Sequence, residues 1–273
     1  MKKRSKSIGV FDSGFGGLSI LKEIVKKLPK YHYVYLGDSA RAPYGSRSPK
    51  EIYTFTVEAV DFLFAHGCDL IIIACNTASA EAVRKIQREY LPKKYRHKRV
   101  LGVIVPALEE AIVRTKTKRV GVIATEATVA SNTFPREMKL RDPRVHIFQN
   151  GAPLLVPLVE MGQHRTLQTN SLLKKYLQPL LKSNIDTLIL GCTHYGHLIS
   201  PIRKITGKGI RLISEGPIVA RKLRKYLTRH PEMESLLVRT GGVVFYSTDA
   251  SERFRKFGSM FYGRSIRPLS AKL

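Results

Sequence analysis

Short apolar runs that alternate with helix-length segments constrain this fold more than any other feature of the sequence. Runs rich in Ile, Val and Leu occupy 8–12, 70–74, 119–124 and 187–190, and amphipathic segments such as 18–28 separate them. Strands that are buried on both faces are continuous aliphatic runs, and their alternation with helices is typical of parallel βαβ units. The sequence therefore predicts an α/β protein.

An internal repeat lies within this alternation. Residues 71–77 (IIIACNT) align with 188–194 (LILGCTH), and upstream 8–13 (IGVFDS) aligns with 120–125 (VGVIAT). In the first pair, an apolar strand leads to a small residue, a cysteine and polar residues that can cap a helix. Because ligands bind at the carboxyl ends of strands in open α/β sheets, a duplicated unit would bring the two cysteines to one cleft from opposite sides.

These cysteines, Cys75 and Cys192, are suited to acid/base chemistry. The partial positive charge at a helix N-terminus lowers the pKa of a thiol there, which favours the thiolate. A thiolate on one face of a carbon can remove a proton while a thiol on the other face returns one, and the product is an inverted stereocentre. Either cysteine alone would be interpreted as a small buried hydrophobe, whereas the matched pair favours catalysis.

Other functions of the cysteines are less favoured. Cys68 precedes Asp69 and lacks polar capping residues after it, so we interpret it as structural. No two cysteines have the spacing of zinc ligands, so no metal site is expected. A disulfide between Cys75 and Cys192 would fit poorly with a reducing compartment.

The cytoplasm is the expected location of this chain. Three cysteines are too few, and odd in number, for a disulfide scaffold. No apolar run approaches the ~18–20 residues of a membrane span, so no membrane association is expected. The sequence opens with the basic MKKRSK, but Ile8–Phe11 is too short for the apolar core of a signal peptide.

The balance of charge is strongly basic. The chain has 47 Lys and Arg against 21 Asp and Glu, a formal net charge of +26. Such a chain either binds nucleic acid or has a solvated basic surface that attracts anionic metabolites. The positive residues are spread along the sequence, without zinc-finger spacing or an aromatic RNA-binding motif. A solvated surface is therefore favoured, and nucleic-acid binding is left open.

Four motifs together resemble the glutamate racemases, which belong to the cofactor-independent aspartate/glutamate racemase family. They are DSGFGG (12–17), GDSARAPYG (37–45), ACNTAS (74–79) and GCTHY (191–195). The resemblance runs in order from Ile8 to about Gly263. Aspartate racemases share the cysteine pair but differ from this chain at the Asp-Ser-Gly opening and at Pro-Tyr-Gly.

The resemblance implies a fold of two similar, pseudo-symmetric parallel-sheet α/β domains with the active site in the cleft between them. It places residues 1–98 and 207–273 in the first domain, with Asp12 and Cys75. It places residues 99–206 in the second domain, with Cys192. The chain is thus expected to return to the first domain after Thr206.

The resemblance also implies roles for particular residues. Cys75 and Cys192 would be the two acid/base groups, and Glu160 an auxiliary carboxylate near the second cysteine. Glu160 could equally be a solvent-facing residue at the end of an apolar helix. The residues expected to hold the substrate are Asp12, Ser13, Tyr44, Gly45, Asn76, Thr77, Thr193 and His194.

The chemistry of these side chains suits an amino-acid substrate. Hydroxyls and backbone N–H groups at helix N-termini bind carboxylates. Asp12 can accept a hydrogen bond from the substrate ammonium, and His194 can share a proton with Cys192.

The implied function is the interconversion of L- and D-glutamate without a cofactor, to supply D-glutamate for peptidoglycan. The expected partner is the small-molecule substrate glutamate, and a homodimer is left open. Two alternatives are a broad-specificity aspartate/glutamate racemase and a racemase-fold protein that binds nucleic acid through its basic surface.

Overall fold

Two parallel β-sheets organise the molecule. The computed structural model describes residues 6–273, so residues 1–5 of the basic N-terminal stretch lie outside the described residues. The first sheet has the strand order β10-β9-β2-β1-β3-β4 and the second has the order β6-β5-β7-β8. All paired strands in both sheets are parallel, which confirms the predicted α/β class with two parallel-sheet units.

The strands of both sheets are short. Those of the first sheet are β1 (Ser7–Asp12), β2 (Tyr33–Gly37), β3 (Cys68–Ile73), β4 (Arg99–Gly102), β9 (Val243–Ser247) and β10 (Leu269–Ser270). Those of the second sheet are β5 (Arg119–Ala124), β6 (His146–Gly151), β7 (Thr187–Gly191) and β8 (Arg211–Ile213).

Helices connect and cover these strands. In the first part of the chain they are α1 (Leu18–Lys27), η1 (Ser39–Arg41), η2 (Tyr44–Ser46), α2 (Pro49–Ala65), α3 (Asn76–Glu81), α4 (Val83–Lys85), the π-helical η3 (Ile86–Tyr90) and α5 (Leu91–Lys94). In the middle they are α6 (Ile104–Arg114), α7 (Glu126–Ala130), α8 (Thr133–Lys139), α9 (Leu155–Glu160), α10 (Leu167–Lys182), η4 (Thr193–Leu198) and α11 (Ile199–Thr206). The last three are α12 (Glu215–Arg229), α13 (Pro231–Glu234) and α14 (Glu252–Tyr262).

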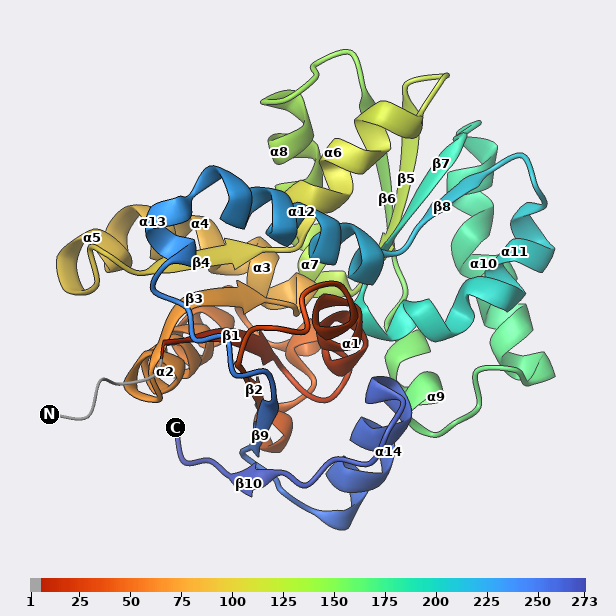
Figure 1. Ribbon diagram of the computed structural model, residues 1–273. Helices are drawn as coiled ribbons and strands as arrows, with labels where there is room; N and C mark the ends of the chain where they lie inside the picture. The colour runs from red at the N-terminus through yellow and green to blue at the C-terminus, as the bar shows by residue number, and fades with distance from the viewer. Residues whose placement is uncertain (1–5) are drawn as a thin grey trace, which may run out of the picture.

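The internal repeat is visible in the order of the strands. The segment β2-β1-β3-β4 of the first sheet has the same order as β6-β5-β7-β8, because in each the first strand lies between the second and the third. Strands β9 and β10 then extend the first sheet beyond β2. In Figure 1 the second sheet lies at the upper right of the first, and α12 runs between them.

The fourth strand of each repeat differs from the division expected from the sequence. β4 pairs with β3 in the first sheet, although residues 99–102 were assigned to the second domain. β8 pairs with β7 in the second sheet, although residues 211–213 were assigned to the first domain. The chain therefore crosses between sheets after Gly102 and again after Ile213. The boundaries of independent folding units remain a prediction.

Local sequence explains the elements that position the site. The central strands β1, β3 and β7 are buried along almost their whole length, as their aliphatic runs predict. Helix α1 buries Leu18, Leu21 and Ile24 on one face, which packs against α12 and α14. Helix α2 begins with a capping box, in which Ser48 and Glu51 each bind the other's backbone N–H.

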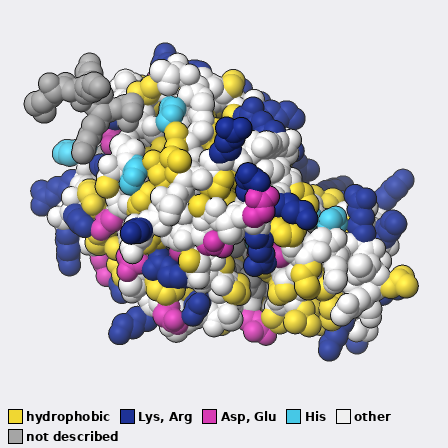
Figure 2. Space-filling model, turned by 90° about the horizontal axis from the view of Figure 1, so that it is seen from below, with side chains coloured by type: hydrophobic (Ala, Val, Ile, Leu, Met, Phe, Trp, Pro, Cys, Tyr) yellow, Lys and Arg dark blue, Asp and Glu magenta, His cyan; other side chains and the backbone are white. Residues whose placement is uncertain are grey.

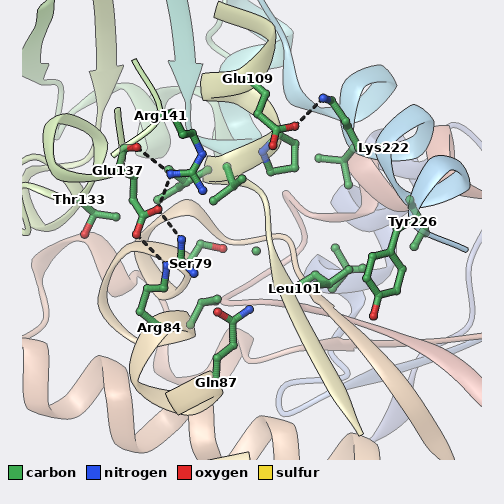
Figure 3. Close-up of a pocket in the computed structure, with 18 of the residues that line it drawn as sticks. Ser79, Arg84, Gln87, Leu101, Glu109, Thr133, Glu137, Arg141, Lys222 and Tyr226 are labelled. Carbon is green, nitrogen blue, oxygen red and sulfur yellow. Dashed lines mark hydrogen bonds and ion pairs between the residues drawn. The ribbon is translucent and has the colours of Figure 1, made fainter. Parts of the chain in front are cut away.

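Ion pairs join the two halves of the molecule beside strand β4 and helix α12. A cavity of about 240 Å³ lies there. In Figure 3, Glu137 of α8 lies between Arg84 of α4 and Arg141, at 2.6 and 2.7 Å respectively. Glu109 of α6 pairs with Lys222 of α12 in the same view. The lining of this cavity contains no cysteine, so it is not the active site predicted from the sequence.

The basic surface is not gathered into one stripe on the face that Figure 2 shows. Lys and Arg occupy many separate places there, with Asp and Glu among them. A nucleic-acid partner remains a prediction. No helix within residues 6–273 is long and apolar enough to cross a membrane.

Candidate active site

A cavity of about 100 Å³ lies between the carboxyl ends of the two sheets. The predicted site residues that line it are Ser13, Tyr44, Gly45, Cys75, Asn76, Thr77, Cys192, Thr193 and His194. Asp12 and Glu160 lie outside its lining. Both cysteines of the repeat therefore reach one cavity, each from the loop after the third strand of its sheet.

Cys75 connects β3 to α3. It is the N-cap of α3, and its Sγ lies 3.5 Å from the backbone N–H of Ala78 and 3.4 Å from the Ser13 hydroxyl. Burial raises the pKa of the Cys75 thiol to about 11, and the neighbouring Asp12 carboxylate acts in the same direction. The hydrogen bonds from Ser13 and Ala78 oppose this shift without reversing it.

Cys192 occupies the corresponding position after β7, where the 3-10 helix η4 begins. Its Sγ lies 3.8 Å from Nδ1 of His194. Burial raises the pKa of the Cys192 thiol well above its usual value, although the backbone N–H of His194 lowers it. The expectation that helix N-termini would lower the pKa of these thiols is wrong. Loss of solvent outweighs the hydrogen bonds that the helix N-termini donate to the two thiols.

A chain of polar contacts leads away from Cys192. Nε2 of His194 lies 3.1 Å from Oε1 of Glu160, and Oε2 of Glu160 accepts from Nη2 of Arg253 at 3.0 Å. The carboxylate thus orients the ring whose other nitrogen faces the thiol. Because α14 returns from the end of the chain to supply Arg253, this contact also joins α14 to α9, which lie side by side in Figure 1.

Asp12 lies at the end of β1 and is almost fully buried. Its Oδ2 accepts a hydrogen bond from the backbone N–H of Gly14 at 3.0 Å, whereas Oδ1 has no partner within the described residues. Burial raises the pKa of Asp12, and the nearby His194 lowers it. An unpartnered carboxylate oxygen at this position can accept from a substrate ammonium group.

Contacts within the protein restrict what the Tyr44 side chain can offer to a ligand. Its hydroxyl donates to Oδ2 of Asp38, and its ring is buried against Phe11 and Phe55. The hydroxyl is therefore already engaged within the protein. Any contribution of Tyr44 and Gly45 to ligand binding comes from their backbone groups and from the wall that they form.

The predicted Thr77 belongs to a cluster of three threonines, of which the other two, Thr125 and Thr128, are not among the site residues expected from the sequence. The hydroxyl of Thr77 lies 2.9 Å from that of Thr125, which lies 2.9 Å from that of Thr128. Thr125 also lines the cavity. Its alignment with Ser13 in the repeat is the signal that could have identified it, since Ser13 was assigned to the site.

Gly16 allows the loops of the two halves to approach closely. A Cβ atom at this position would lie 2.7 Å from the ring of His194 and would overlap the hydroxyl of Thr193. Real Cβ atoms do not approach other atoms this closely. The glycine-rich turn therefore does more than link β1 to α1, because it lets the first half pack directly on the loop of Cys192.

The remaining cysteine does not reach the cavity. Cys68 begins β3, is completely buried, and does not line the site. Burial raises its pKa to about 12. Among the residues that the structure describes, no three His, Cys, Asp or Glu side chains are grouped so that they could hold a metal ion.

Comparison with known proteins places this site in context. The sequence profile of the Asp/Glu/Hydantoin racemase family matches residues 8–223. A glutamate racemase from Sulfurihydrogenibium is 39% identical over 261 residues, which cover 94% of each chain. The chain belongs to the glutamate racemase family.

Solved structures of this family agree in fold with the present chain. A glutamate racemase from Bacillus anthracis superposes with a TM-score of 0.91 at 34% identity, covering 99% of this chain and 98% of that one. The glutamate racemase from Francisella tularensis, solved in complex with D-glutamate, gives a TM-score of 0.88 at 32% identity, covering 98% of each chain. The family membership indicates an isomerase, and the resemblance and fold expected from the motifs are confirmed.

Proposed function

We propose that this protein interconverts L- and D-glutamate by two-base proton transfer at Cα, with Cys75 and Cys192 as the two acid/base groups. One observation carries the proposal. Two buried thiols line a single cavity, and each comes from the equivalent loop of a repeated α/β unit. Inversion at a carbon is achieved most directly by one acid/base group on each face, and the two loops support the assignment of one thiol to each.

The reaction balances in protons and electrons. A thiolate removes the Cα proton, and the electron pair of the broken C–H bond is delocalised into the α-carboxylate. The opposite thiol then donates its proton to the other face of Cα, and the pair of cysteines exchanges protonation states. In the direction implied by the family resemblance, Cys75 deprotonates D-glutamate and Cys192 deprotonates L-glutamate.

Burial makes the thiolate costly, and substrate binding reduces that cost. Both thiols have pKa values above the usual value for cysteine. The ammonium group of a bound amino acid is a positive charge close to Cα, and a nearby positive charge favours the thiolate. Hydroxyls of Ser13, Thr77 and Thr193 are suited to bind the carboxylates of the substrate.

The wider role of the reaction follows from the family. We propose that the D-glutamate supplies peptidoglycan synthesis, in the cytoplasm. The substrate is the small molecule glutamate. The proposed chemistry calls on thiols, hydroxyls and carboxylates of this chain alone.

Incubation with L-glutamate in deuterated water tests the overall reaction. We expect D-glutamate that carries deuterium at Cα. Replacing either thiol by the far less acidic serine hydroxyl should abolish racemisation, so Cys75→Ser and Cys192→Ser should both be inactive. Cys68→Ser is the matched control, because its thiol lies outside the cavity, and it should racemise normally.

Half-reactions then assign each thiol to one face. A glutamate analogue with a leaving group at Cβ needs only the remaining thiolate as base for elimination. Cys75→Ser should process the L-analogue, and Cys192→Ser the D-analogue. Near-wild-type racemisation by either serine variant would overturn the proposed roles of these thiols.

A further inference from the structure

Glu215 is a buried carboxyl group that the proposed reaction does not yet use. It is the first residue of α12, directly after β8 and Ser214, and only 4% of it is exposed. Its Oε2 accepts a hydrogen bond from Nδ2 of Asn76 at 2.7 Å, across 139 positions of sequence. This bond joins the beginning of α12 to the residue that follows Cys75.

The contact orients the side-chain amide of Asn76. An asparagine amide has one donor nitrogen and one acceptor oxygen, so an acceptor partner determines which end faces it. With Nδ2 committed to Glu215, Oδ1 of Asn76 has no partner within the described residues, although it is buried. Asn76 lines the cavity that holds both thiols.

Oδ1 of Asn76, like Oδ1 of Asp12, is a buried acceptor without a partner within the described residues, and such an acceptor on a residue that lines the cavity favours a donor from the ligand. The two carboxylates of glutamate are acceptors at neutral pH, and its ammonium group is the donor. We propose that Glu215 is a positioning residue, which holds the Asn76 amide so that Oδ1 accepts a hydrogen bond from the ammonium group of the substrate. This inference rests on the proposed function, because it presumes an amino-acid substrate in the cavity.

The protonation of Glu215 is compatible with this role. Burial raises the pKa of Glu215 to about 8, the hydrogen bond from Asn76 lowers it, and the nearby Asp12 raises it further. A carboxyl group has an oxygen that can accept from Nδ2 whether or not the other oxygen carries a proton. Glutamine offers the same acceptor with nearly the same shape, whereas leucine offers none.

Binding measurements test the inference independently of turnover. Calorimetry should be run in the Cys75→Ser background with two ligands, D-glutamate and glutarate, which lacks the amino group. We expect Glu215→Leu to weaken the binding of D-glutamate by about tenfold, the loss expected for one hydrogen bond to a charged group. Glutarate should bind equally well to both proteins, and Glu215→Gln should restore most of the affinity for D-glutamate.

A double-mutant cycle identifies the route of the effect. If Glu215 acts through Asn76, the Asn76→Ala and Glu215→Leu variants and the double variant should all lose similar affinity for D-glutamate. In the cysteine-intact protein, Glu215→Leu should raise KM for glutamate more than it lowers kcat. Thermal unfolding of each variant establishes that the chain is folded.

Three results would overturn the inference. They are an equal loss of glutarate and D-glutamate affinity, a Glu215→Gln variant as weak as Glu215→Leu, or losses that multiply in the double variant. Failure of the proposed function has a different signature, since it would appear as racemisation by Cys75→Ser or none by the wild type. The ratio of the two ligands' affinities is measured without turnover and separates these cases.

Discussion

The hydroxyl oxygens of Thr77 and Thr125 lie 2.9 Å apart, although they belong to helices that follow strands of different sheets. Thr77 is in α3 after β3, and Thr125 caps α7 after β5. Both line the cavity of the two thiols. This hydrogen bond therefore spans the boundary between the repeated units inside the site.

Removing the hydroxyl of Thr125 should lower stability measurably. Thr125→Val keeps the shape of the side chain but removes its hydrogen bonds to Thr77 and Thr128 and its cap on α7, and it leaves the Thr77 hydroxyl with a weaker contact to Thr128, at 3.3 Å. We expect a loss of about 1 kcal/mol in the free energy of unfolding, measured by urea titration. Thr54→Val, at an exposed position of α2, is the matched control and should change little. Equal losses in both variants would contradict the assignment of stability to the hydrogen bonds of the Thr125 hydroxyl.

Gly16→Ala should damage catalysis more than folding. The added methyl group would press on Thr193 and His194, and displacement of groups at a reacting centre by about 1 Å can cost a hundredfold in rate. We expect kcat/KM for glutamate to fall by about that factor. At Gly14 a Cβ atom meets nothing within 4 Å, so Gly14→Ala should racemise normally. A fully active Gly16→Ala enzyme would show that the two loops can separate without loss.

Glu160→Gln should slow proton removal by Cys192 but not by Cys75. Glu160 contacts His194, and His194 contacts Cys192, so the variant should slow the elimination reaction of the L-analogue, for which Cys192 is the proposed base. A decrease of about tenfold is expected from the loss of one charge-assisted hydrogen bond. The D-analogue should react at the normal rate. Glu252→Gln, whose carboxylate pairs with Arg255 on the surface, serves as the control.

The Glu137 ion pairs predict a loss of stability in acid. Hydrogen bonds from Arg84 and Arg141 hold the pKa of Glu137 at about 2, against 4.5 as its ordinary value. A carboxyl group with a lowered pKa in the folded state stabilises the protein above its ordinary pKa, and this stabilisation disappears as the pH falls towards 2. Both arginines are partly exposed, so we expect only about 1–2 kcal/mol from this source.

Urea unfolding between pH 7 and pH 3 measures this effect. The wild type should lose more stability over this range than Glu137→Gln, which cannot titrate at this position. Parallel pH curves for the two proteins would show that Glu137 has the same pKa in the folded and unfolded chains.

Aspartate should be a poor substrate. Its side chain is one methylene shorter, so its second carboxylate cannot reach receptors placed for glutamate and leaves them unpaired. We expect kcat/KM for L-aspartate to be at least about a hundredfold lower than for L-glutamate. Comparable values for the two amino acids would favour a broad-specificity racemase.

The sequence is most informative where one short segment determines both the structure and the chemistry. The aliphatic runs before Cys75 and Cys192 predict strands, and the repeat predicts that both thiols meet, as they do in one cavity. The apolar runs predict the short strands β4 and β8, but the strands pair with β3 and β7, which the expected division places in the other domain. A run of three or four residues contains no information about which sheet it joins.

The sequence does not predict contacts between distant segments. The bond from Asn76 to Glu215 spans 139 positions, and neither residue's surroundings show it locally. The pKa of each thiol is raised, and not lowered as the sequence predicts, for the same reason. A helix N-terminus is visible in a sequence, whereas the burial that outweighs it depends on the packing of both halves.

The ion pairs beside β4 determine the geometry of any opening of the site. The chain crosses between the sheets after β4 and after β8. Next to those crossings, Glu137 pairs with Arg84 and Glu109 pairs with Lys222. Glu160 of α9 and Arg253 of α14 form a further ion pair between the two halves, at 3.0 Å. Charged contacts therefore join the halves both beside β4 and at α14, and an opening that preserves the pairs beside β4 has to break the pair of Glu160 and Arg253 first.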